Sequence, residues 1–116
     1  MSALVLPIDY ADPIGALPLP EDPAERAECF RIALGGEMRK LYLPGNRLMW
    51  TRAEEGDAND PLINYRATPI AQHYGAISEA ECIAGYAVIT SGDGRGDASP
   101  LSDAQFNETL AELLIL

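Results

Sequence analysis

The side chains best suited to catalysis are few in this sequence and lie far apart. The only histidine is His73, so a serine or cysteine triad would need it as the base. The two cysteines, Cys29 and Cys82, are distant from each other, and neither has a recognised nucleophile context. The sequence also lacks the G-x-S-x-G pattern of a nucleophile elbow. We therefore expect no enzyme activity, and a small enzyme that uses His73 ranks last among the functions considered.

The sequence indicates no cofactor and no dedicated metal site. Zinc sites need clustered cysteine and histidine, which one histidine and two distant cysteines do not supply. Glu55, Asp57 and Asn59 alternate as hard-cation ligands do. An EF-hand loop that starts at Glu55 nevertheless has Asp60 in place of glycine and Arg66 in place of the closing glutamate. A solvated acidic loop is the simpler interpretation, and an adventitious calcium or magnesium site is the alternative.

Residues 91–100, "SGDGRGDASP", are similar to several short binding motifs and match none of them. A dinucleotide fingerprint needs a third glycine where Asp97 stands, and a phosphate-binding loop needs a lysine that this segment lacks. An EF-hand loop that starts at Asp93 would have Ala104 in place of the closing glutamate. The adhesion tripeptide Arg95-Gly96-Asp97 requires an extracellular setting, which a start without a signal peptide argues against. We expect a flexible, acid-bearing connection to the last helix.

Composition and charge narrow the partners. The chain has 116 residues, 47% of them hydrophobic and 22% charged, which is typical of one globular domain. Its net charge of −10 repels nucleic acid and anionic membranes, so neither is an expected partner, whereas a basic protein surface is. No run of 18 apolar residues is present. We expect a protein made in a reducing cytoplasm, with two buried thiols rather than a disulfide.

The positive charges gather in one short segment. Residues 37–53 contain four basic residues and one acid, together with Tyr42 and Trp50, between two acidic stretches. Tryptophan and arginine are enriched in protein interaction hot spots, so we predict that this segment contacts a partner protein. A half-buried hairpin whose arginines pair with nearby carboxylates is the alternative. The predicted contact residues are Arg39, Tyr42, Arg47, Trp50 and Arg52.

The first twenty residues predict an extended N-terminal arm. Prolines at positions 7, 13, 18 and 20 exclude a helix and argue against a central strand. The segment is too apolar for a solvated linker, so it either wraps its own domain or straps onto a neighbour. We thus divide the chain into an arm, 1–20, and a single domain, 21–116. The arm residues predicted to contact a partner are Leu6, Ile8, Tyr10, Ile14, Leu17 and Leu19.

Two helices have clear start signals. Asp22 is a suitable N-cap before Pro23, and Gly35 is a suitable end for the helix that follows. Ser102 and Gln105 form a capping box for the last helix.

The apolar face of the last helix predicts burial. Phe106, Leu110, Leu113 and Leu114 share one face at helical spacing. The final residues, 110–116, are too apolar for a frayed tail, so we expect them to be buried in the domain or in a partner.

The middle of the chain predicts a hairpin and less regular segments. Residues 37–52 are expected to form two strands around a type II turn at 43–46. Residues 53–61 are expected to form a loop, and 62–78 an extended segment that Pro69 interrupts. Ser78 and Glu81 indicate a helix start, although the end of that segment favours a strand. The expected fold is a small α+β domain with two to three helices, a β-hairpin and the proline-rich arm.

Three functions follow from this reading. The leading one is a non-enzymatic, protein-binding or structural subunit of a larger assembly, with a bacteriophage virion component (cement, connector or tail accessory) as the concrete case. The alternative is a small acidic inhibitor that imitates nucleic acid and occupies a basic host protein. Its phosphate-like acids would be Glu54, Glu55, Asp57, Asp60, Glu108 and Glu112. The enzyme centred on His73 is third.

Overall fold

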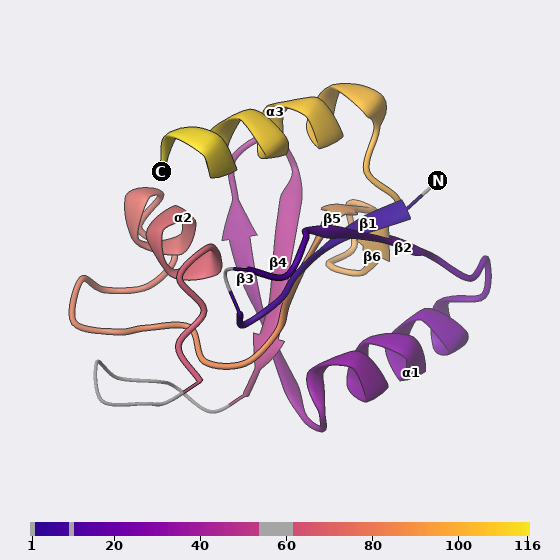
Figure 1. The fold of residues 1–116 in the computed structure, drawn as a ribbon. Helices are drawn as coiled ribbons and strands as arrows, with labels where there is room; N and C mark the ends of the chain where they lie inside the picture. The colour runs from indigo at the N-terminus through magenta and orange to yellow at the C-terminus, as the bar shows by residue number, and fades with distance from the viewer. Residues whose placement is uncertain (1, 10, 54–61) are drawn as a thin grey trace.

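The computed structural model of the chain describes residues 2–9, 11–53 and 62–116 (Figure 1). In chain order the elements are β1 (Ser2–Leu6), β2 (Gly15–Pro18), α1 (Pro23–Leu34), β3 (Met38–Leu43), β4 (Arg47–Arg52), α2 (Ala67–His73), β5 (Ala87–Gly92), β6 (Ala98–Ser99) and α3 (Asp103–Ile115). All paired strands are antiparallel, in the order β2-β1-β5-β4-β3, and β6 pairs with β5. The expected α+β class is confirmed. No described helix has both the length and the apolar composition that crossing a membrane requires.

The N-terminal segment belongs to the sheet. β1 lies between β2 and β5, with Leu4 opposite Ile89, so the argument against a central strand was wrong. β1 ends before Pro7, and Pro18 lies on the edge strand β2, where a missing N–H is tolerated. Of the two predicted alternatives, the structure therefore shows the first: the segment lies on its own domain.

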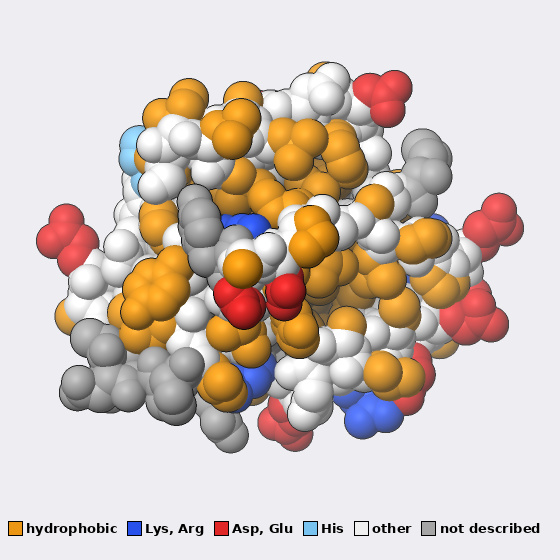
Figure 2. All heavy atoms as spheres, viewed as in Figure 1, with side chains coloured by type: hydrophobic (Ala, Val, Ile, Leu, Met, Phe, Trp, Pro, Cys, Tyr) orange, Lys and Arg blue, Asp and Glu red, His pale blue; other side chains and the backbone are white. Residues whose placement is uncertain are grey.

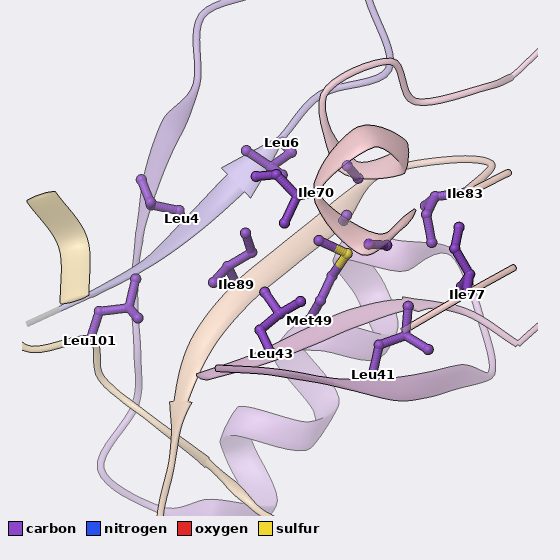
Figure 3. Close-up of a cluster of buried hydrophobic side chains, with 13 residues drawn as sticks. Leu4, Leu6, Leu41, Leu43, Met49, Ile70, Ile77, Ile83, Ile89 and Leu101 are labelled. Atoms are coloured by element: carbon purple, nitrogen blue, oxygen red, sulfur yellow. The ribbon is translucent and has the colours of Figure 1, made fainter. Parts of the chain in front are cut away.

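Helices lie on both faces of the sheet (Figure 1). α2 and α3 cover the face that bears the larger core, shown in Figure 3, and α1 covers part of the opposite face. Because side chains alternate along a strand, odd-numbered residues of β3 and β4 point to the larger core and even-numbered ones to the α1 side. The larger core consists of Leu4, Leu6, Leu41, Leu43, Met49, Ala67, Ile70, Ala71, Ile77, Ile83, Ala87, Ile89 and Leu101.

Helices α1 and α3 begin at the predicted residues. The Asp22 carboxylate accepts the Ala24 N–H at 3.0 Å, and Gly35 ends α1 with φ of +82°, a conformation that favours glycine. The Ser102 hydroxyl accepts the Gln105 N–H at 3.1 Å, and the Gln105 side chain accepts the Ser102 N–H at 2.9 Å. Both predictions are confirmed at the level of individual hydrogen bonds.

The hairpin of β3 and β4 is also confirmed. Leu43 pairs with Arg47, and the three residues between them form the turn. Gly45 has φ of +78°, as the third residue of a type II turn requires, and Asn46 is also left-handed at +56°.

The extended reading of residues 62–78 was wrong, because the segment contains α2. Pro69 stands in the first turn of this helix, where its missing N–H breaks no helical hydrogen bond. The Asn64 side-chain oxygen accepts the N–H groups of Arg66 and Ala67 at 3.1 and 3.0 Å, which fixes the first turn. Asn64 was the missed start signal.

The helix expected at Ser78 was also wrong. Ser78 and Glu81 form a turn, with the Glu81 N–H 3.2 Å from the Ser78 carbonyl oxygen. The Ile83 N–H is bound by the Thr68 hydroxyl at 2.9 Å, and Gly85 has φ of +84°. These contacts place 78–86 against α2 as an irregular segment, and the predicted strand character appears only from Ala87 onward.

Candidate functional site

The basic hairpin is divided between the two faces of the sheet. Arg39 forms an ion pair with Glu81, and Arg47 lies 2.9 Å from the Glu112 carboxylate. These two arginines therefore pair with nearby carboxylates, as the alternative interpretation predicted. Arg52 is half-buried, and its side chain packs against Gly85.

Arg47 is the centre of a buried polar cluster and is 1% exposed. Its Nη1 donates to the Thr109 hydroxyl at 2.9 Å, and its Nε donates to the Pro44 carbonyl at 2.8 Å. The guanidinium lies 5.9 Å from the Tyr74 ring centroid. The neighbouring Glu112 carboxylate, together with burial, raises the pKa of Tyr74. The predicted partner contact at Arg47 is corrected: this residue holds α3 against β4 and is inaccessible to a partner.

The predicted contact residues of the N-terminal segment that the structure describes are buried or partly buried. Leu6 is fully buried in the larger core, which removes it from any binding surface. Ile14 packs against that core, and Leu17 and Leu19 pack against the α1-side core; all three are partly buried. Ile8 is partly buried. Tyr10 lies outside the described residues.

Two aromatic residues of the hairpin remain accessible on the α1 side. Tyr42 is 66% exposed and Trp50 is half-buried, with its indole N–H donated to the Thr90 hydroxyl at 2.9 Å. The Lys40 ammonium lies 5.6 Å from the Tyr42 ring centroid and 5.7 Å from that of Trp50, within cation–π range. The structure thus brings together the even-numbered residues of the predicted basic and aromatic segment.

The loop between β5 and β6 closes on itself. One Asp93 carboxylate oxygen accepts the N–H groups of Arg95 and Asp97 at 2.7 and 3.1 Å, and these bonds lower the pKa of Asp93. The Lys40 ammonium donates to the Gly96 carbonyl from the neighbouring strand. The expectation of a flexible connection did not include these bonds. Because the two amides are occupied, they cannot cradle a phosphate.

The last turn of α3 exposes apolar side chains. Leu114 is 89% exposed, Ile115 82% and Leu116 43%, whereas Leu110 and Leu113 are partly buried against the larger core. The prediction that Leu114 shares the buried face was wrong, and the domain does not bury the end of 110–116. Sequence periodicity found the core-facing leucines and missed the outward ones.

A hollow of about 320 Å³ adjoins this turn. Figure 2 shows hydrophobic side chains over α3 and in the recess beside it. The residues that line the hollow are Ile14, Arg66, Leu110, Leu113 and Leu114. We call this hollow, together with Leu114, Ile115 and Leu116, the α3 surface.

The remaining chemical groups do not form a cluster. His73 is exposed at the end of α2, with its ring 4.8 Å from that of Tyr74. Cys29 and Cys82 are free thiols and only half-buried, which corrects their predicted burial. Within the part of the chain that the structure describes, no three histidine, cysteine or acidic side chains are placed to hold a metal ion. The predicted acidic loop at 54–61 lies outside that part.

Comparison of the chain with protein-family models, with curated proteins and with solved structures gives no match.

Proposed function

We propose that this chain is a non-enzymatic, protein-binding subunit of a larger assembly and that it docks through the α3 surface. The observation that carries this proposal is the exposure of Leu114 and Ile115, at 89% and 82%, beside an apolar hollow. Contiguous exposed apolar side chains next to a recess are characteristic of protein interaction sites. The domain partly buries Leu110 and Leu113, so the proposed partner would cover only the exposed residues 114–116.

The free energy gained by burying Leu114 and Ile115 is sufficient for docking. Full burial of a leucine or isoleucine side chain contributes roughly 1.5–3 kcal/mol. Leu114 and Ile115 are nearly fully exposed, so their burial by a partner would supply about twice that amount before the cost of association is subtracted. The hollow beside them can receive one apolar side chain of the partner, which is the usual arrangement of an interaction hot spot.

Charge identifies the kind of partner. Arg66 lines the hollow, but Asp103 and Glu108 are exposed on the same helix α3, and the whole chain has a net charge of −10. A second copy of the chain would bring the same negative charge, whereas a protein with an apolar patch and a basic rim would be attracted. The occupant that we propose is therefore a different, basic protein.

The assembly remains the proposed setting, and a bacteriophage virion component remains its concrete case. The N-terminal segment no longer supports this setting as a strap, because residues 2–6 and 15–18 pair within their own sheet. The support now comes from the α3 surface. The inhibitor alternative is weakened, since Glu112 pairs with the buried Arg47 and does not belong to an acidic face.

Binding by matched variants tests the proposal. A tagged chain is used to capture partners from its native host, and each purified candidate is then titrated by calorimetry against three forms of the chain. These are the unchanged chain, the double variant L114S/I115S and the control I32S. Ile32 is 69% exposed on α1, so its replacement removes similar apolar area far from the α3 surface.

The expected result is a basic partner whose affinity falls about tenfold or more in L114S/I115S and is unchanged in I32S. Its affinity should also decrease with increasing salt. Equal affinity for all three forms contradicts the proposal, and so does self-association of the chain as its only interaction. If the partner is a nucleic-acid-binding enzyme that the chain inhibits independently of Leu114, the inhibitor function replaces the assembly function.

A further inference from the structure

A second hollow, on the opposite side of the sheet from the α3 surface, has the composition of a ligand site. It lies between α1, the β3–β4 hairpin and the end of the β5–β6 loop, with a volume of about 330 Å³. Small-molecule sites typically have volumes of about 300–1,000 Å³, so this hollow suits a ligand the size of one ring and a short chain. The lining residues are Pro23, Ala24, Arg26, Ala27, Phe30, Met38, Trp50, Asp97 and Ala98. We call it the Trp50 hollow.

Aromatic rings form the apolar part of the Trp50 hollow. The ring centroids of Phe30 and Trp50 are 5.5 Å apart with an angle of 31° between the planes. The indole N–H of Trp50 is already bound by Thr90, so a ligand at this ring needs no polar group of its own there. Ala27 leaves one wall small. These features favour a flat, apolar group.

One cation of the hollow has no carboxylate partner. The Arg26 side chain donates its Nε to the Pro20 carbonyl and its Nη1 to the Ala98 carbonyl, the latter at 3.0 Å. Among the described residues, Arg26 forms no ion pair, in contrast to Arg31, which pairs with Glu28. Two backbone carbonyls thus hold the guanidinium in place while its charge remains uncompensated.

We propose that the Trp50 hollow binds a small apolar ligand that carries a carboxylate. The ring of the ligand packs against Trp50, with the buried Phe30 ring behind it, and its carboxylate binds the guanidinium of Arg26. A planar guanidinium matches a carboxylate in shape and charge, and its fixed position reduces the entropic cost of binding. This inference is independent of the α3 surface and of the protein partner proposed above.

Asp97 and Lys40 are two further charged residues at or near the hollow. Asp97 lines it, and its carboxylate repels a ligand carboxylate. The Lys40 ammonium, bound to the Gly96 carbonyl and 5.7 Å from the Trp50 ring centroid, adds positive charge near that ring. Of Arg26, Lys40 and Asp97, two are cations and one is an acid. This balance fixes the sign of the effect that each charge-removing variant should have.

The test uses three probes that share a phenyl ring and a three-carbon chain and differ in charge: 3-phenylpropionate, 3-phenylpropanol and 3-phenylpropylamine. Trp50 is the only tryptophan of the chain, so its fluorescence reports binding at the hollow directly. The order of affinity expected is propionate, then alcohol, then amine. Saturable binding of the amine at equal or higher affinity overturns the proposal, as does the absence of any saturable change with propionate.

Matched variants distinguish the loss of a charge at the hollow from a general disturbance of the fold. R26Q should weaken 3-phenylpropionate binding by about tenfold and leave the alcohol unchanged, whereas the control R31Q on the same helix should affect neither. D97N should strengthen propionate binding by roughly threefold, because a repulsive charge is removed. Unchanged propionate affinity in R26Q, or weaker binding in D97N, contradicts the assignment.

A variant that fills the hollow tests the site without changing Arg26. Leucine is a good helix former, so A27L should fold normally and abolish binding of both propionate and alcohol. The control A111L adds the same volume at an exposed position of α3 and should bind as the unchanged chain does. Binding that survives in A27L contradicts the location. Glycylphenylalanine, compared with 3-phenylpropionate, distinguishes a peptide C-terminus from a free organic acid as the source of the carboxylate.

Discussion

Replacement of Glu112 by leucine is expected to destabilise the domain strongly, because it leaves the buried Arg47 cation without its carboxylate. The Arg47 side chain is 0% exposed and that of Glu112 is 14% exposed, and their nearest charged atoms are 2.9 Å apart. The Thr109 hydroxyl and the Pro44 carbonyl can still accept hydrogen bonds from Arg47 after the change, but neither carries a negative charge.

The expected magnitude follows from the burial of this pair. Removal of one partner from a buried ion pair costs about 3–5 kcal/mol, and replacement of both by apolar residues of similar volume is often near neutral. The two retained hydrogen bonds place E112L near the lower end, at about 3 kcal/mol. R47M should also lose about 3 kcal/mol, because both carboxylate oxygens of Glu112 are buried and would lose their cation. The double variant R47M/E112L should be at least about 2 kcal/mol more stable than the sum of the single effects predicts.

Urea unfolding of the four forms measures these free energies directly. The exposed pair of Glu28 and Arg31 on α1 is the control, and its removal should change stability little. If E112L and R47M each have small, additive effects, Arg47 and Glu112 do not act as a buried pair, and the attachment of α3 must be explained by its leucines alone.

Two further predictions concern pH. The neighbouring Glu112 carboxylate raises the pKa of Tyr74 in the folded state, so the contribution of Tyr74 to stability should decline as pH rises above about 10, the unfolded value. E112Q should lower this pKa in an NMR titration, and an unchanged value would contradict the contact. The N–H groups of Arg95 and Asp97 lower the pKa of Asp93, so its contribution should be present above about pH 3.9 and be lost as pH falls through the folded value. Urea unfolding between pH 2 and 5 should show this loss in the unchanged chain and less of it in D93N, and equal curves would contradict the closed turn.

Local chemistry made the two long helices and the hairpin predictable. Asp22 and Ser102 form the same capping bonds in the structure that their sequence context indicates, because a cap acts within three residues. Gly45 likewise adopts the positive φ that its turn requires. These features depend on residues adjacent in sequence, so no knowledge of the fold was needed.

The missed elements depend on contacts between distant residues. The Asn64 side chain fixes α2 and also donates to the carbonyls of Leu6 and Gly85, which only the folded chain brings near. β1 is central because it pairs with β5, more than 80 residues later in the chain. Propensity arguments could not anticipate either arrangement, since tertiary contacts override local preference.

The predicted site residues lie on both faces of the sheet, and tertiary contacts again decide which of them are buried. Strand alternation sends Arg39 and Arg47 toward acids that the sequence places about 40 or more residues away, and leaves Tyr42 and Trp50 on the other face. The outward position of Leu114 was likewise hidden, because the buried side of a helix is fixed by what packs against it.

Hydrogen exchange of the chain, alone and bound to its captured partner, tests the central proposal most directly. Docking through the α3 surface predicts slower exchange of the backbone amides from Leu110 to Leu116 in the complex, with the Trp50 hollow and the exposed face of α1 unchanged. If these amides exchange equally fast in the free and bound chain, or if protection appears only around Tyr42 and Trp50, the α3 surface is not the binding site.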